Sequence, residues 1–206
     1  MLTIYGIYRS RASRNIWLVN ELGIPFKLVP VVQRYRLPDP PPAGVLHTRS
    51  PEFLKVNPNG HVPTIDDDGL VLHESLAINL YLAKKHGGPL APATVAEDGQ
   101  MGMWSLWAVT EVEGPALSIA QNGPADGPIA ALRAPFAVLD QALAKDGHLV
   151  GNRFTVADVN AAEIVRYAQR APVLFDAAPR VKAWLAACHA RPAFKKMWAE
   201  REKEPA

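Results

Sequence analysis

The spacing of hydrophobic residues changes along the chain. Two short β-prone apolar runs, at residues 2–7 and 26–32, flank a helical pattern that ends at Gly23. A strand, a helix and a second strand within about thirty residues predict a βαβ unit with parallel strands. Gly23 suits the end of this helix because glycine readily adopts a positive φ.

A second pattern follows between residues 57 and 86. Two short apolar runs, 62–65 and 70–72, are separated by Asp-Asp-Gly, which predicts a tight hairpin. Ser75 then precedes an apolar run with helical spacing and no helix breaker before Gly87. Added to the first unit, these elements give the order βαβ-ββα, which is that of a thioredoxin-like α/β domain.

The rest of the chain predicts only helices. We expect them at about residues 97–121, 128–145, 156–169, 179–190 and 193–200. A segment rich in glycine and proline precedes them and is typical of an interdomain linker. The expected organisation is therefore a thioredoxin-like domain at 1–85, a linker at 86–97 and an all-α C-terminal domain at 98–206.

Two local motifs have a structural interpretation. Thr155 and Asp158 have the spacing of a capping box, in which each side chain bonds the backbone of the other residue, so we expect them to stabilise a helix start. Residues 36–44 contain four prolines, which remove backbone donors and fix φ. This segment is predicted to be an exposed loop.

Composition and charge argue against a nucleic-acid, metal or membrane partner. A net charge of +2 is too small to indicate a nucleic-acid partner. The single Cys excludes an internal disulfide, and the six His show no zinc-ligand spacing, so we expect no metal. No apolar run approaches the ~20 residues that span a membrane, and the N-terminus opens directly on a strand pattern. We therefore expect a cytoplasmic protein with no membrane partner.

The element order and two residue pairs resemble the glutathione S-transferase family. The pairs are Val62-Pro63 before the hairpin and Glu74-Ser75 at the following helix. The resemblance implies the glutathione S-transferase fold, with a cis peptide bond before Pro63. It also implies glutathione as co-substrate, its cysteinyl part paired with the Val62 backbone and its γ-glutamyl head held by Glu74 and Ser75.

The chemistry of such a site depends on keeping the glutathione sulfur as a thiolate, which is the nucleophile. Alignment of the segment after the first helix with serine-type members, such as the theta and zeta classes, places their catalytic serine at or beside Ser10. Ser13 and Tyr5 are the alternatives, and Ser10 could instead act only as a helix cap. His61 stands where related proteins place a side chain near the glycyl carboxylate of glutathione.

The second substrate is expected to contact the first long helix of the C-terminal domain, in a cleft between the domains. The residues that could line its pocket repeat at helical spacing: Met103, Trp104, Trp107 and Glu111. Such a stripe of Met and Trp is also typical of a helical core.

The resemblance implies a detoxification enzyme that conjugates glutathione to an electrophilic, largely apolar small molecule. It also implies a homodimer. Two alternatives stay open. One is a non-catalytic glutathione-binding or protein-interaction module of the same fold, and the other is a glutathione-dependent isomerase, peroxidase or dehalogenase that uses the same thiolate.

Overall fold

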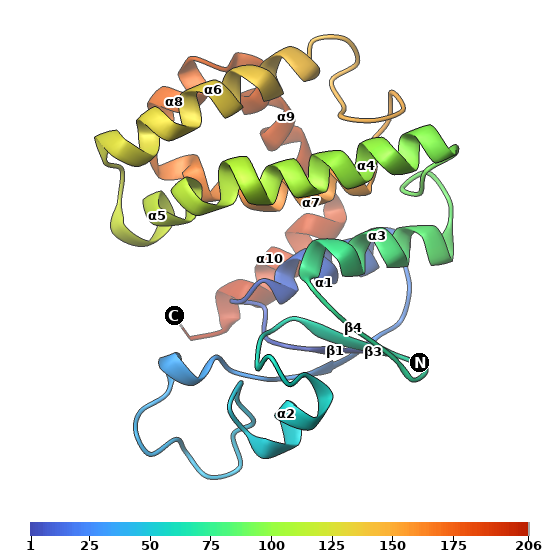
Figure 1. Ribbon diagram of the computed structural model, residues 1–206, viewed down its shortest axis with the longest axis vertical. Helices are drawn as coiled ribbons and strands as arrows, with labels where there is room; N and C mark the ends of the chain where they lie inside the picture. Colours follow the sequence, from blue (N-terminus) through green and yellow to red (C-terminus); the bar gives the residue numbers. More distant parts are fainter. Residues whose placement is uncertain (206) are drawn as a thin grey trace. The chain divides into compact units, whose positions relative to one another are not determined.

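The computed structural model describes residues 1–205, which form two compact units. The first unit combines Met1–Leu82 with the segment from Pro192 onward, and the second comprises Ala83–Arg191. Figure 1 shows strands only in the first unit and helices throughout the second.

The first unit is built on a four-stranded mixed sheet in the order β2-β1-β3-β4. The strands are β1 Leu2–Tyr5, β2 Lys27–Val29, β3 Thr64–Asp67 and β4 Leu70–His73. β1 runs parallel to β2 and antiparallel to β3, and β3 forms the hairpin with β4. Ile4 lies opposite Ile65 at the centre, and both are fully buried. The predicted βαβ-ββα arrangement is confirmed.

Helices cover this sheet on both sides. Figure 1 shows α1 (Ala12–Leu22) and α3 (Ser75–His86) on one side and the short α2 (Pro51–Val56) on the other. α1 supplies the core with four consecutive fully buried residues from Ile16 to Val19. It ends at Gly23, whose φ of 67° is left-handed and whose N–H donates to the carbonyl of Asn20. Gly23 is therefore the C-cap that the sequence predicted.

The segment after β2 has little regular structure. A single 3-10 turn, η1 (Arg34–Arg36), precedes the prolines, and Arg34 donates to the carbonyl of Leu37 and pairs with Asp39. No helix or strand is assigned at residues 37–50. The proline-rich segment is thus a loop, as its missing backbone donors predicted.

The last helix, α10 (Pro192–Lys203), packs against α1. The rings of Trp17 and Phe194 meet edge to face at 5.0 Å between centroids, and Phe194 stacks on Trp198 at 5.5 Å. The sequence placed this helix in a C-terminal domain of residues 98–206, whereas its contacts group it with the first unit. Helical periodicity shows that a helix has an apolar face but not which element covers that face.

The second unit is helical. Its elements are α4 Val95–Trp107, the π-helix η2 Ala108–Glu113, α5 Gly114–Asn122, α6 Asp126–Ala142, α7 Val156–Val165, the 3-10 helix η3 Arg166–Arg170, α8 Pro172–Asp176 and α9 Pro179–Ala190. Every residue of α7 is buried, so α7 forms the centre of this unit. The all-helical prediction for this part of the chain is confirmed. No helix within residues 1–205 has the length and apolar character needed to cross a bilayer.

The helix expected at residues 97–121 is divided by a π-helical turn. The π turn ends at Glu113, directly before Gly114 and Pro115. Proline has no N–H to give the carbonyl four residues earlier, and its ring collides with that carbonyl in a regular α-helix. A wider π turn relieves this conflict without ending the helix.

The predicted capping box at the start of α7 is confirmed. The Thr155 N–H donates to Oδ2 of Asp158 at 2.9 Å, and the Ala157 N–H donates to Oγ1 of Thr155 at 3.3 Å. Oδ1 of the fully buried Asp158 also accepts from Nε1 of Trp184 at 2.9 Å. The box therefore connects the start of α7 to α9.

Candidate functional site

Ser10 and Val62 both lie beside Gly6. Gly6 follows β1 and has a φ of 151°. A methyl group on Gly6 would lie 2.7 Å from Cβ of Ala12, 3.5 Å from Oγ of Ser10 and 3.6 Å from Cβ of Val62. Oγ of Ser10 and Cβ of Val62 therefore lie at most 7.1 Å apart, although they belong to different segments of the βαβ-ββα domain.

Ser10 lies in the turn between β1 and α1 and is 7% exposed. Its hydroxyl donates to the carbonyl of Ile7 at 2.7 Å and accepts from the N–H of Ala12 at 3.1 Å. A serine hydroxyl has one proton to donate. A rotation about the Cβ–Oγ bond would redirect that proton from Ile7 to a ligand, while Ala12 could still donate to Oγ.

The Val62–Pro63 peptide bond is cis, as the resemblance implied. The turn before it is held by Asn57, which is buried and whose Nδ2 donates to the carbonyl of His61 at 3.1 Å and to Oγ1 of Thr64 at 3.0 Å. Sequence reasoning did not assign Asn57 to the site. The only signal available was its position at the start of the turn Asn57-Pro58-Asn59-Gly60.

Glu74 and Ser75 occupy the start of α3. Glu74 has a φ of 72°, a left-handed conformation that is uncommon for a residue with a side chain, and its carboxylate is exposed. Ser75 is buried, and its hydroxyl accepts from Nη1 of Arg14 at 3.1 Å. Asn15 donates to the Ser75 carbonyl at 2.8 Å. Two consecutive side chains of α1 therefore hold the first residue of α3.

The other candidates for thiol activation lie in different environments. Ser13 is fully buried inside α1. Tyr5 is the last residue of β1, and its ring lies 6.1 Å from that of Phe53 between centroids. His61 is exposed in the turn before Val62. Oγ of Ser10 and Cβ of Val62 both lie within 4 Å of the position that a Cβ on Gly6 would take.

The four proposed acceptor residues lie on α4 and η2 of the second unit. Met103 and Glu111 are exposed, and the rings of Trp104 and Trp107 meet edge to face at 5.1 Å. The two tryptophans therefore pack on each other along one side of the helix.

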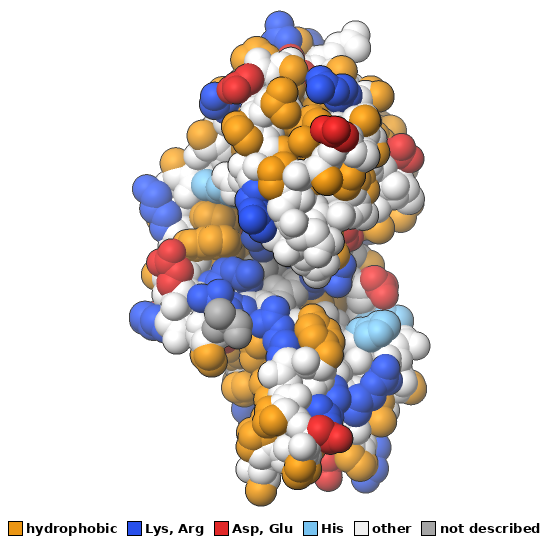
Figure 2. All heavy atoms as spheres, turned by 90° about the vertical axis from the view of Figure 1, so that its left-hand side faces the viewer, with side chains coloured by type: hydrophobic (Ala, Val, Ile, Leu, Met, Phe, Trp, Pro, Cys, Tyr) orange, Lys and Arg blue, Asp and Glu red, His pale blue; other side chains and the backbone are white. Residues whose placement is uncertain are grey.

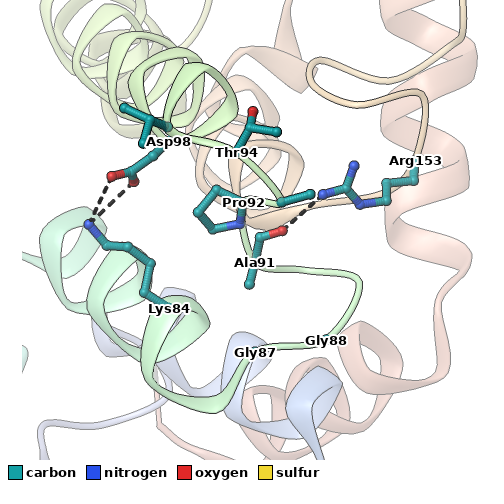
Figure 3. A pocket seen from close by; sticks show the side chains of 10 residues that line it. Lys84, Gly87, Gly88, Ala91, Pro92, Thr94, Asp98 and Arg153 are labelled. Atoms are coloured by element: carbon teal, nitrogen blue, oxygen red, sulfur yellow. Dashed lines mark hydrogen bonds and ion pairs between the residues drawn. The ribbon is translucent and has the colours of Figure 1, made fainter.

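A hollow of about 670 Å³ lies at the start of α4, and none of the candidate residues lines it. Figure 3 shows Lys84 directed at Asp98 and Arg153 directed at the carbonyl of Ala91. Arg153 also pairs with Glu97 at 2.6 Å, and this hydrogen bond is the main reason that the pKa of Glu97 falls to about 2. The polar groups at this hollow form hydrogen bonds and ion pairs with one another. These interactions hold the segment before α4 in place.

Residues 1–205 contain no group of three or more His, Cys, Asp or Glu side chains placed to hold a metal ion. Figure 2 shows acidic and basic side chains interspersed with apolar ones on the face it draws. Several Lys and Arg side chains gather near the middle of that face.

Comparison with known proteins identifies the family. The profile described as "Glutathione S-transferase, N-terminal domain" matches residues 9–85, and "Glutathione S-transferase, C-terminal domain" matches residues 129–192. The chain is 33% identical over 220 residues to glutathione S-transferase 3 of Zea mays, covering 95% of this chain and 92% of that protein.

Solved structures agree with this result. Glutathione transferase F7 from Populus trichocarpa superimposes with a TM-score of 0.81 at 25% identity, covering 97% of this chain and 99% of that one. The theta class glutathione S-transferase of Xanthomonas axonopodis pv. citri, solved with glutathione bound, gives a TM-score of 0.74 at 27% identity, with 95% of each chain covered. The protein belongs to the glutathione S-transferase family.

Proposed function

We propose that the protein is a glutathione transferase in which Ser10 stabilises the glutathione thiolate for attack on an electrophilic, largely apolar small molecule. The observation that carries the proposal is the convergence of Ser10 and Val62 at Gly6. The Val62 backbone would pair with the cysteinyl unit in the manner of one added rung of a β-ladder. The sulfur would then lie within reach of the Ser10 hydroxyl.

The free energy needed to lower the pKa of the glutathione thiol is modest. A thiol with a pKa near 8.5 is only roughly 3% ionised at pH 7. Lowering that pKa by about two units takes roughly 2.7 kcal/mol of preference for the thiolate. A hydrogen bond to a charged acceptor supplies about 1.5–3 kcal/mol. The Ser10 hydroxyl also accepts from the N–H of Ala12 in the first turn of α1, which polarises its own proton toward the sulfur.

The γ-glutamyl head would be held at the start of α3. Because Arg14 donates to Oγ of Ser75, the Ser75 hydroxyl keeps its own proton for the carboxylate of the ligand. The N–H groups in the first turn of α3 favour the same anion. Glu74 would accept from the γ-glutamyl ammonium group. His61 would lie near the glycyl carboxylate.

We propose that the acceptor contacts Met103, Trp104, Trp107 and Glu111. Large apolar side chains with exposed edges suit an apolar electrophile. Substitution of Trp104 or Trp107 by Ala is then expected to raise the KM for an apolar acceptor more than the KM for glutathione. Equal KM values for the acceptor in the variants and the wild type would remove these residues from the pocket.

The test of the function is retention on immobilised glutathione combined with saturable conjugation of a dinitrohaloarene. Ser10→Ala is expected to keep retention but lose about tenfold to a hundredfold of kcat, in proportion to the lost thiolate. Tyr5→Phe is the matched control and should retain wild-type kcat.

Other outcomes identify the alternatives. Retention without turnover of any electrophile identifies a glutathione-binding module. An absence of retention identifies a scaffold of the same fold. Turnover of a haloalkane, a peroxide or an isomerisable substrate in place of conjugation keeps the Ser10 chemistry but changes the reaction class.

We further propose a homodimer. Leu106 and Val109 are 68% and 42% exposed, lie three residues apart and so share one side of α4 and η2. Analytical ultracentrifugation of the wild type and of a Leu106→Glu, Val109→Glu variant tests this. A wild-type mass equal to that of one chain would contradict it.

A further inference from the structure

The end of α10 contacts the loop that carries Ser10. Both carboxylate oxygens of Glu204 accept from this loop, Oε1 from the N–H of Tyr8 at 2.9 Å and Oε2 from the N–H of Arg9 at 2.7 Å. Nε of Arg9 donates to the backbone carbonyl of Glu204 at 2.7 Å, and Arg201 donates to the carbonyl of Tyr8. Four hydrogen bonds thus join two segments that lie almost two hundred residues apart in sequence.

We propose that Glu204 is a positioning residue, which fixes the Tyr8–Arg9 backbone and thereby directs the Ser10 hydroxyl toward the glutathione sulfur. The inference rests on the proposed function of Ser10. Ser10 follows Arg9 directly, and its N–H bonds the carbonyl of Ile7 at 3.1 Å. The four-residue turn from Ile7 to Ser10 therefore has its two central N–H groups held by one carboxylate.

The contact is suited to this role because a carboxylate that accepts two adjacent N–H groups sets their orientation as well as their position. The loop between β1 and α1 otherwise leaves these donors without a partner from a sheet or a helix. α10 is in turn held on α1 by the contact between Trp17 and Phe194. The loop that carries the Ser10 hydroxyl is thus held on α1 in two ways. It continues directly into α1, and it is bonded through Glu204 to α10, which packs on α1.

The guanidinium groups of Arg9 and Arg201 donate to the backbone carbonyls of Glu204 and Tyr8, respectively. Burial, followed by the negative charges of Glu200 and Glu204, raises the pKa of Tyr8 above its usual value. Replacement of Glu204 by the neutral Gln separates the geometry of this contact from its charge.

The test compares Glu204→Ala and Glu204→Gln with Glu202→Ala. Glu202 is on the same helix end, is exposed and accepts from Nε1 of Trp198 at 3.1 Å, so it serves as the matched control. Three quantities are measured: amide hydrogen exchange at Tyr8 and Arg9, the pKa of bound glutathione from the ultraviolet absorbance of its thiolate, and kcat separately from KM.

Glu204→Ala is expected to speed exchange at both amides at least tenfold, to raise the pKa of the bound thiol toward that of free glutathione, and to lower kcat about tenfold with a small change in KM. Glu204→Gln, which keeps one acceptor oxygen, should fall between Glu204→Ala and the wild type. Glu202→Ala should match the wild type in all three measurements.

Several outcomes would overturn the inference. Unchanged exchange in Glu204→Ala would show that Glu204 does not hold the loop. Faster exchange with wild-type thiol pKa and kcat would show a structural contact without influence on Ser10. A wild-type protein that binds no glutathione would refute the proposed function and this inference together, whereas a wild type that binds and an indistinguishable Glu204→Ala would refute the inference alone. Because Glu204→Gln preserves the shape of the side chain, it decides the matter if Glu204→Ala unfolds.

Discussion

Nη1 of Arg14 donates to Oγ of Ser75 across 3.1 Å, although 61 residues separate them. Arg14 is 1% exposed, so its guanidinium is a buried charge directly behind the proposed γ-glutamyl position. The same part of α1 holds α3 a second time, since Nδ2 of Asn15 donates to Oδ1 of Asn79 at 2.7 Å and Asn79 donates to the Arg14 carbonyl. The start of α3 is therefore fixed before any ligand arrives.

Replacement of Arg14 by Met should weaken glutathione binding and stability together. The change removes the donor to Ser75 and the buried positive charge, so we expect the Kd for glutathione to rise about tenfold or more. The free energy of unfolding should fall by about 1–3 kcal/mol. Isothermal titration calorimetry and denaturant unfolding measure the two effects. Arg36→Met, at an exposed position, is the control, and an unchanged Kd in Arg14→Met would contradict this role.

A methyl group at Gly6 should disrupt the proposed site. In Gly6→Ala the new Cβ would approach Cβ of Ala12 to 2.7 Å, which no side-chain rotation can relieve, and the φ of 151° disfavours any side chain. We expect a loss of about 2–4 kcal/mol in stability and of measurable glutathione binding.

Gly88→Ala provides the comparison for Gly6→Ala. Gly88 also has a positive φ, 78°, but an added methyl group there meets nothing within 4 Å. Thermal unfolding should show only the backbone penalty, about 1 kcal/mol, with glutathione binding retained. Equal effects of the two substitutions would mean that the close approach at Gly6 is unimportant.

Asp158 is expected to be the most sensitive polar position of the helical unit. Its carboxylate accepts from the N–H of Thr155 and from Nε1 of Trp184 while fully buried. In Asp158→Asn one of these donors would face the amide NH₂, so unfolding in urea should show a loss of about 2–4 kcal/mol. Asp176→Asn, which breaks an exposed pair with Lys182, should lose less than about 1 kcal/mol. Similar losses in both variants would contradict the expectation.

His189 should make the protein less stable in mild acid. Burial is the main cause that lowers the pKa of His189 to about 4. Between about pH 4 and pH 6.5 the side chain is therefore neutral in the folded state. In the unfolded chain its pKa is near 6.5, so it takes up a proton in the same range. Its contribution to stability is therefore complete above about pH 6.5 and declines as pH falls toward 4. By about pH 5 the expected loss is about 2 kcal/mol.

The matching variant is His189→Gln, which does not titrate. The difference in unfolding free energy between the wild type and this variant should change in favour of the variant as pH falls from about 7 to about 5. Chemical denaturation at several pH values measures it. Curves that stay parallel over this range would show that His189 titrates alike in the folded and unfolded states.

The sequence was sufficient for features that depend on neighbouring residues. Turn residues, the capping pair at Thr155 and the strand–helix–strand spacing each have a local physical cause, and each lies where it was predicted. The π turn before Pro115 was missed because an apolar helical pattern continues through it, although the proline itself was a signal.

The supporting contacts of the candidate site could not be read from the sequence. Asn57, Glu204 and the bond from Arg14 to Ser75 join segments whose proximity arises only once the elements pack. An asparagine in a turn or a glutamate after a helix has no distinguishing local pattern. The candidates proposed to contact the ligand, Ser10 and Val62, could be named from the family resemblance, whereas the residues that support them are identified only by the folded structure.

The return of α10 to α1 gives the chain a nested connectivity, in which one folding unit is inserted within the sequence of another. During synthesis, the stretch up to Leu82 leaves the ribosome long before the helix that covers Trp17 has been translated. The inserted helices can mature first, and the half that bears Ser10 is completed last. Premature termination before Pro192 would thus remove the Phe194 contact with Trp17 and expose the unit that bears Ser10 to proteolysis.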